Sequence, residues 1–108
     1  MTQLDGDGAG KKIIVNVDRD LEDLIPGFMD NRQNDIVTIR NAVEQEDYET
    51  VRSLAHCLKG CGAGYGFNEI TEIGATLEQA AKAKDRQKIE EWLNCLAQYL
   101  GKVEIVYE

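Results

Sequence analysis

The spacing of apolar residues constrains the fold of this chain more than any other feature. From Asp18 onward, apolar side chains recur at intervals of three and four residues, which is the repeat of an amphipathic helix. Ala, Leu, Glu, Gln and Lys are plentiful in the C-terminal half, and these residue types favour helices. The apolar stripe of the first helical stretch is expected to comprise Leu21, Leu24, Ile25, Phe28, Met29, Ile36, Ile39 and Val43.

Polar capping residues divide the rest of the sequence into three further helices. Asp47 is a suitable N-cap for a second helix over about 48–64, Asn68 for a third and Asp85 for a fourth. Pro26 is expected to open a new helix or to kink an existing one, since its ring fixes φ and removes a donor. The expected apolar stripe of the second helix is Tyr48, Val51, Leu54, Ala55 and Leu58. That of the third helix is Ile70, Ile73, Leu77, Ala80 and Ala81, and that of the fourth helix is Ile89, Trp92, Leu93, Leu96, Leu100 and Val103.

Four amphipathic helices joined by short connections predict an all-α fold, an antiparallel up-down-up-down four-helix bundle with a short N-terminal arm. A chain of 108 residues makes one domain. Residues 1–17 are expected to form the arm, which is partly flexible, and residues 18–108 to form the bundle. Within the arm, residues 13–17 are interpreted as a short extended piece that packs on the domain.

Charge and hydropathy argue against several classes of protein. The formal net charge of −8 argues against nucleic acid as a partner, since phosphates select basic faces. No apolar run approaches the roughly 20 residues that span a bilayer, and no signal peptide is visible, so we expect a cytoplasmic protein that does not bind membranes. Cys57, Cys61 and Cys95 are an odd count without a secretory signal, and we expect free thiols.

The segment from His56 to Phe67 contains the only histidine of the chain among a cluster of glycines. On a helical wheel at about 100° per residue, the apolar stripe of the second helix lies on one side and His56 falls roughly opposite. The residues that share the half of the wheel with His56 are Arg52, Lys59, Gly60 and Ala63. His56 is therefore predicted to lie on the solvent face, with the cationic Lys59 one helical turn further along the chain and small residues around it.

An exposed neutral imidazole is suited to group transfer. Histidine is the one side chain whose unperturbed pKa lies near neutrality, so a nucleophilic ring nitrogen is available. Such a nitrogen can attack phosphorus through an anionic transition state that needs positioning and charge neutralisation. Lys59 can screen the phosphoryl oxygens, and Gly60 removes the side chain that would block an incoming active site. We expect no cofactor of the chain's own, and Mg²⁺ supplied by the partner protein.

Several residues around this histidine match a known family when taken together. They are His56-Cys57-Leu58-Lys59-Gly60, then Gly62 and Gly64, then Tyr65-Gly66-Phe67, and Leu77-Glu78 on the next helix. Over about residues 18–106 the chain resembles the histidine-containing phosphotransfer (HPt) domain. The resemblance implies a phosphorelay intermediate without kinase activity, which accepts a phosphoryl group from a receiver-domain aspartate and passes it to another receiver. It further implies response-regulator receivers and a hybrid histidine kinase as partners, and we expect a monomer.

The resemblance assigns a role to each matching position. His56 would be the phospho-accepting residue, Lys59 would stabilise the phosphoryl group, and Gly60 would give the receiver room. Ala63 and Gly64 are expected to lie close to the phosphate or the partner. On the third helix, Glu78 resembles the place where many members keep a polar residue near the imidazole, and Lys82 occupies a position that is basic in some members. One departure is that Cys61 and Gly62 stand where Ser or Ala is usual.

Two other classes of function stay open. One is a helical docking module that binds a receiver or kinase without phosphotransfer. The other is a metal- or redox-sensing bundle that uses Cys57, Cys61 and His56, although the wheel separates Cys61 from His56 and favours small, buried or half-buried thiols instead. The charged residues Arg32, Asp35, Arg40 and Glu44 are interpreted as a solvated face.

Overall fold

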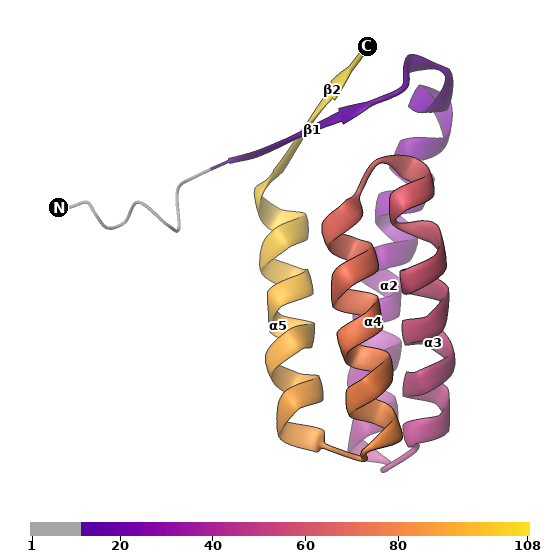
Figure 1. Cartoon of the computed structure of the whole chain (residues 1–108), viewed down its shortest axis with the longest axis vertical. Coiled ribbons are helices and arrows are strands. Elements are labelled where there is room, and N and C mark those ends of the chain that lie inside the picture. Colours follow the sequence, from indigo (N-terminus) through magenta and orange to yellow (C-terminus); the bar gives the residue numbers. More distant parts are fainter. Residues whose placement is uncertain (1–11) are drawn as a thin grey trace, which may run out of the picture.

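The computed structural model describes residues 12–108, and the arm predicted for residues 1–17 falls mostly outside this range. The elements are β1 (Ile13–Val17), the 3₁₀ turn η1 (Arg19–Leu24), α2 (Ile25–Glu44), α3 (Tyr48–Cys61), the 3₁₀ turn η2 (Ala63–Tyr65), α4 (Asn68–Lys82), α5 (Arg86–Lys102) and β2 (Val103–Tyr107). The four long helices lie side by side and alternate in direction (Figure 1), which confirms the predicted four-helix bundle. None of the helices in this part of the chain combines the length and the apolar character needed to cross a bilayer.

Two of the helices begin at the predicted aspartates. The carboxylate of Asp47 accepts the backbone N–H of Thr50 at the start of α3, and that of Asp85 accepts the N–H of Lys88 at the start of α5. Each bond satisfies a donor that the helix itself leaves free, which stabilises the start of the helix. Pro26 lies in the first turn of α2, so it opens this helix and does not kink it.

The connection between α3 and α4 differs from the prediction. The second helix does not reach residue 64, because α3 ends at Cys61 and the turn η2 follows. Gly66 then adopts the left-handed region at φ 93°, which glycine tolerates readily. The turn delivers the ring of Phe67 into the core, stacked on Phe28 with 5.3 Å between ring centroids. Because α4 begins at Asn68, its N-cap residue is the buried Phe67, and the prediction that Asn68 caps this helix is wrong.

The apolar stripes of the helices meet in one continuous core. Fully buried residues come from every helix, among them Ile39 of α2, Leu58 of α3, Leu77 of α4 and Leu96 of α5. Burying such a side chain stabilises the fold by roughly 1.5–3 kcal/mol. Several residues of the predicted stripes depart from this pattern: Leu21, Met29, Tyr48, Leu54 and Trp92 are only partly buried, and Leu24 is 53% exposed. Leu24 lies in η1, before α2 begins, so the stripe of α2 does not orient it.

A two-stranded parallel ladder crosses one end of the bundle (Figure 1). β1 pairs with β2 from Ile13↔Val103 to Val17↔Tyr107, and Val17 is 1% exposed. The extended piece predicted at residues 13–17 is confirmed. Val103 begins β2, so its place in the stripe of the fourth helix is wrong. The residues from Val103 to Tyr107 are rich in β-branched and aromatic side chains, which favour a strand once a partner strand is present.

Candidate functional site

His56 lies in the middle of α3 on the face that points away from the core. The stripe residues Val51, Ala55 and Leu58 of the same helix are fully buried, whereas the imidazole is 67% exposed. Because a single stripe of α3 faces the core, a residue one position after Ala55 must point outward. The predicted exposure of His56 is confirmed.

The close packing of α4 on α3 brings a second functional group to the histidine. Gly74 marks the place of closest approach, since a Cβ atom there would lie 2.5 Å from the backbone N of Lys59 and 2.9 Å from the carbonyl O of Ala55. One turn further along α4, Glu78 lies beside His56, with 3.1 Å between its Oε2 and the imidazole Nδ1. The absent side chain at residue 74 therefore sets the distance between these two groups.

Among residues 12–108, Glu78 is the only charged residue that is buried, with an exposed fraction of 5%. Its second oxygen, Oε1, lies 3.5 Å from Nζ of Lys59. Burial is the largest single influence on the pKa of Glu78 and raises it, but the hydrogen bond from His56 and the nearby charges of Lys59, His56 and Lys82 together outweigh burial. The pKa of Glu78 is thus lowered from its usual 4.5.

The ionisation of Glu78 decides which ring nitrogen of His56 is free. An ionised carboxylate only accepts hydrogen bonds, so the Nδ1 atom that it contacts must donate a proton to it. In a neutral imidazole the other nitrogen, Nε2, then keeps its lone pair. The exposed ring therefore offers Nε2 as the nucleophilic atom.

The glycines of this segment serve two different purposes. At Gly60 and at Gly64 an added Cβ would meet nothing within 4 Å, so both positions are open. At Gly62 it would lie 2.7 Å from the backbone N of Thr71, so Gly62 allows the close packing of the turn against α4. Ala63 is exposed, and its N–H donates to Oγ1 of Thr71 at 2.8 Å. Because α3 ends before them, Ala63 and Gly64 lie in η2 and do not continue the helical face of His56.

The side chain of Arg32 packs against the end of α3, so the prediction of a solvated face is wrong for Arg32 and Asp35. Nε of Arg32 lies 2.9 Å from Oδ2 of Asp35, and these side chains are only 13% and 18% exposed. The guanidinium also covers the ring of Phe28 at 4.7 Å and contacts Sγ of Cys61 at 3.3 Å. Aromatic stacking and the thiol contact hold this cation at the edge of the core.

The three cysteines are free thiols with different environments. Cys61 lies at the edge of the core, as predicted, and its burial raises the pKa of its thiol although Arg32 opposes this. Cys57 and Cys95 are exposed, so the prediction of a half-buried thiol is wrong for Cys57. Within residues 12–108, no three side chains of His, Cys, Asp or Glu converge as metal ligands.

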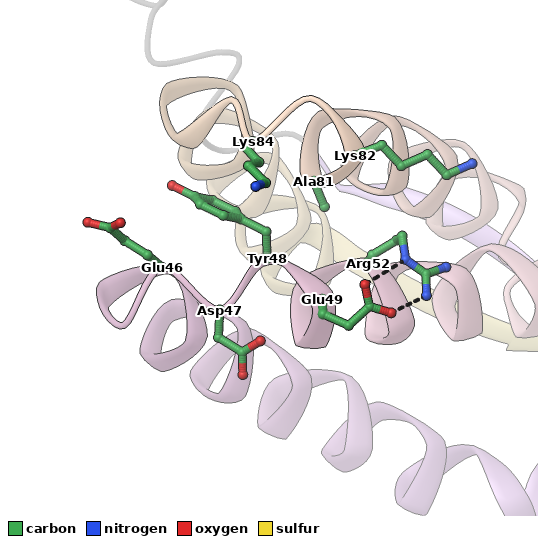
Figure 2. A pocket seen from close by; sticks show the side chains of 8 residues that line it. All are labelled: Glu46, Asp47, Tyr48, Glu49, Arg52, Ala81, Lys82 and Lys84. Atoms are coloured by element: carbon green, nitrogen blue, oxygen red, sulfur yellow. Dashed lines mark hydrogen bonds and ion pairs between the residues drawn. The ribbon is translucent and has the colours of Figure 1, made fainter.

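A cleft of about 570 Å³ begins one turn before His56 and extends between the start of α3 and the end of α4 (Figure 2). Among the residues that line this cleft, only Lys82 was predicted from the sequence as a site residue. Arg52 shares the helical face of His56, which was the available signal for it. The cleft is lined by Glu46, Asp47, Tyr48, Glu49, Arg52, Ala81, Lys82 and Lys84.

The structure thus brings His56, Lys59 and Glu78 into contact, with Lys82 close enough to influence the pKa of Glu78. A family model described as "Hpt domain" matches residues 23–104, a range that contains all four long helices. No curated protein and no solved structure matches this chain. Since the match covers most of the sequence, the chain belongs to the Hpt domain family, whose members are histidine phosphotransfer intermediates of phosphorelays.

Proposed function

We propose that this protein carries a phosphoryl group on His56, taking it from the phospho-aspartate of one receiver domain and passing it to the aspartate of another. The observation that supports this most is the pairing of an exposed imidazole with a buried carboxylate at its Nδ1. That pairing leaves Nε2 free, facing the solvent from which a partner arrives.

The transfer step needs no proton to enter or leave the site. Nε2 of His56 attacks the phosphorus of the aspartyl phosphate, and the P–N bond forms as the P–O bond to the aspartyl carboxyl breaks. The carboxylate leaves with the electron pair of that bond. The imidazole keeps its Nδ1 proton and gains positive charge, which the carboxylate of Glu78, 3.1 Å away, offsets. Transfer to the second receiver is the same step in reverse.

The residues around the imidazole suit the remaining needs of phosphoryl transfer. Lys59 is 48% exposed, and its ammonium can turn from Glu78 toward the phosphoryl oxygens to neutralise their charge. Lys82 adds positive charge on the α4 side of the site. The open positions of Gly60 and Gly64, and the single methyl group of Ala63, leave room for the partner. Mg²⁺ is expected to be held by the acidic pocket of the receiver.

Donor and acceptor are receiver domains, one of them within a hybrid histidine kinase, and a monomer suffices because His56, Lys59 and Glu78 come from one chain. We propose a cytoplasmic location and phosphotransfer without kinase activity of the chain's own.

The test is a transfer assay with the receiver domains encoded in the same genome. Each receiver is phosphorylated with radiolabelled acetyl phosphate and Mg²⁺ and then mixed with wild-type protein or with His56→Gln. We expect at least one receiver to label the wild type with an acid-labile, alkali-stable phosphoryl group, and none to label the variant. Binding of a receiver without any label would favour the docking module instead. A label that survives in His56→Gln would contradict the proposal.

A further inference from the structure

The cleft beside His56 carries cations that have no partner within the described part of the chain. Figure 2 shows Lys82 and Lys84 on the α4 side of the cleft and Tyr48 and Arg52 on the α3 side. Arg52 is paired with Glu49 through Nε and Nη2. Neither Lys82 nor Lys84 forms an ion pair with another residue between 12 and 108.

The acidic residues of the cleft do not neutralise these lysines. The carboxylate of Asp47 is engaged at the start of α3, where it accepts hydrogen bonds from the backbone N–H and the hydroxyl of Thr50. In Figure 2 the carboxylates of Asp47 and Glu46 point away from Lys82 and Lys84. The α4 side of the cleft is therefore locally basic, although the whole chain has a net charge of −8.

A protein that reaches His56 must also cover this cleft. Arg52 lies four residues before His56 on α3, and Lys82 lies four residues after Glu78 on α4, so each is displaced by about 6 Å along its helix. A stable protein interface buries about 800 Å² on each partner, which corresponds to a disc of roughly 16 Å radius. A docked partner centred on the imidazole thus covers Arg52 and Lys82, and it reaches the far end of the cleft at Tyr48, about 12 Å from His56 along α3.

Covering the lysines of the cleft has an energetic consequence. Burying an ammonium without a counter-charge is costly, so a partner that covers Lys82 and Lys84 without pairing them would bind poorly. A partner that places a carboxylate in the cleft would avoid this cost and would also be attracted at long range. The cleft therefore discriminates between partners by the charge of the side chains that face it.

We propose that this cleft receives an acidic side chain of the docked receiver domain, and that Lys82 and Lys84 select receivers that carry such an acid on their docking surface, outside the acidic pocket expected to hold Mg²⁺. This inference rests on the proposed function, because it names the kind of receiver that reaches His56. Arg52 completes the opposite wall when Glu49 yields to the incoming carboxylate.

The test compares two charge reversals that change the net charge equally. Lys84→Glu alters the cleft at a position remote from the imidazole, and Lys88→Glu is the matched control on the exposed side of α5. Each variant is assayed with the receivers that label the wild type, over a series of salt concentrations. A second measurement is labelling of His56 by phosphoramidate, a small donor that needs no docking.

We expect Lys84→Glu to lower the second-order rate constant of transfer from the receiver about tenfold at low salt, with a smaller effect at high salt. Lys88→Glu should transfer like the wild type, and all three proteins should react equally with phosphoramidate. Lys82→Gln should show a fall in the same direction.

Three results would overturn the inference. Equal receiver-driven rates for Lys84→Glu and Lys88→Glu would remove it while leaving the proposed function intact. Impaired labelling of Lys84→Glu by phosphoramidate would show that the substitution acts on the imidazole and not on docking. Failure of every receiver to label the wild type would overturn the proposed function, and this inference with it.

Discussion

Nδ1 of His56 lies 3.1 Å from Oε2 of Glu78, a carboxylate that is only 5% exposed. The two residues come from adjacent antiparallel helices, and the small Gly74 allows those helices to approach closely enough for the bond. A buried anion thus holds an exposed ring in one tautomer. Carboxylates orient metal-binding histidines in the same way, by fixing the tautomer and the direction of the ring.

Loss of the Glu78 carboxylate should slow transfer. We expect Glu78→Ala to reduce the rate constant of phosphoryl transfer to His56 by about 10- to 100-fold, since Nδ1 loses its acceptor and Nε2 is no longer held as the free nitrogen. Glu78→Gln keeps an acceptor oxygen but not the charge, so its rate constant should lie between those of the wild type and Glu78→Ala. Ring ¹⁵N chemical shifts report the tautomer directly, and shifts and rates that match the wild type in Glu78→Ala would contradict this role.

Lys59 should matter for the phosphorylated state. Its ammonium lies 3.5 Å from Oε1 of Glu78 and is half exposed, so it is available to the phosphoryl group. We expect Lys59→Ala to slow transfer or to shorten the lifetime of the phosphohistidine, because one positive charge beside the anion is lost. Unchanged kinetics in a label-transfer and decay assay would remove the role assigned to this residue.

Two glycines that look alike in the sequence should respond oppositely to alanine. Gly60→Ala places a methyl group in open space on a helix, so the free energy of unfolding should rise by up to about 1 kcal/mol. Gly74→Ala forces a methyl group against the backbone of α3 and should lower the free energy of unfolding by about 1–3 kcal/mol. Urea denaturation measures both. Equal shifts of one sign would show that α3 and α4 are not packed as described.

A large side chain at Gly60 should separate docking from chemistry. Gly60→Leu should leave the fold intact, because the position is open, but should obstruct a receiver that approaches His56. We expect receiver-driven labelling to fall while labelling by phosphoramidate is retained. Acceptance of phosphate from the receiver at the wild-type rate would show that the partner does not pass over this position.

The stability of the fold should decrease in acid. The pKa of Glu78 is lowered from 4.5 in the folded protein, and the hydroxyl and backbone N–H of Thr50 lower that of Asp47 from 3.8. Such groups bind fewer protons when folded, so their contribution is complete above the unfolded pKa and is lost as the pH falls through the lower folded value. Thermal melts between pH 7 and pH 3 should show Tm falling below about pH 4.5. Glu78→Gln should show a smaller fall, and an identical fall would mean that Glu78 makes no contribution.

Features that depend on neighbours within one or two turns could be predicted from the sequence. The three- and four-residue spacing of apolar side chains identified the four helices, because this repeat places them on one face whatever the partner helix is. Asp47 and Asp85 were identified as caps because a cap bonds only to the N–H groups two or three residues away. The exposure of His56 followed from its angle to the stripe of its own helix.

Contacts between distant segments could not be predicted in the same way. The pairing of β1 with β2 joins the two ends of the described chain. The apolar spacing of the fourth helix continues to Val103, so this local pattern does not indicate a strand there. Whether a glycine is open, as at Gly60, or packed, as at Gly62, depends on which atoms of another segment lie above it. The burial of Arg32 likewise depends on the end of α3.

The sequence by itself determined four amphipathic helices, the aspartate caps of α3 and α5, and an outward-facing histidine, because each of these follows from local spacing. The resemblance already placed Glu78 near that histidine. Only the tertiary structure decided which ring nitrogen Glu78 contacts, and that Lys82 and Lys84 line a cleft beside it. The physical reason is that these relationships are distances between helices, and such distances are set by how closely the small residues allow α4 to pack on α3.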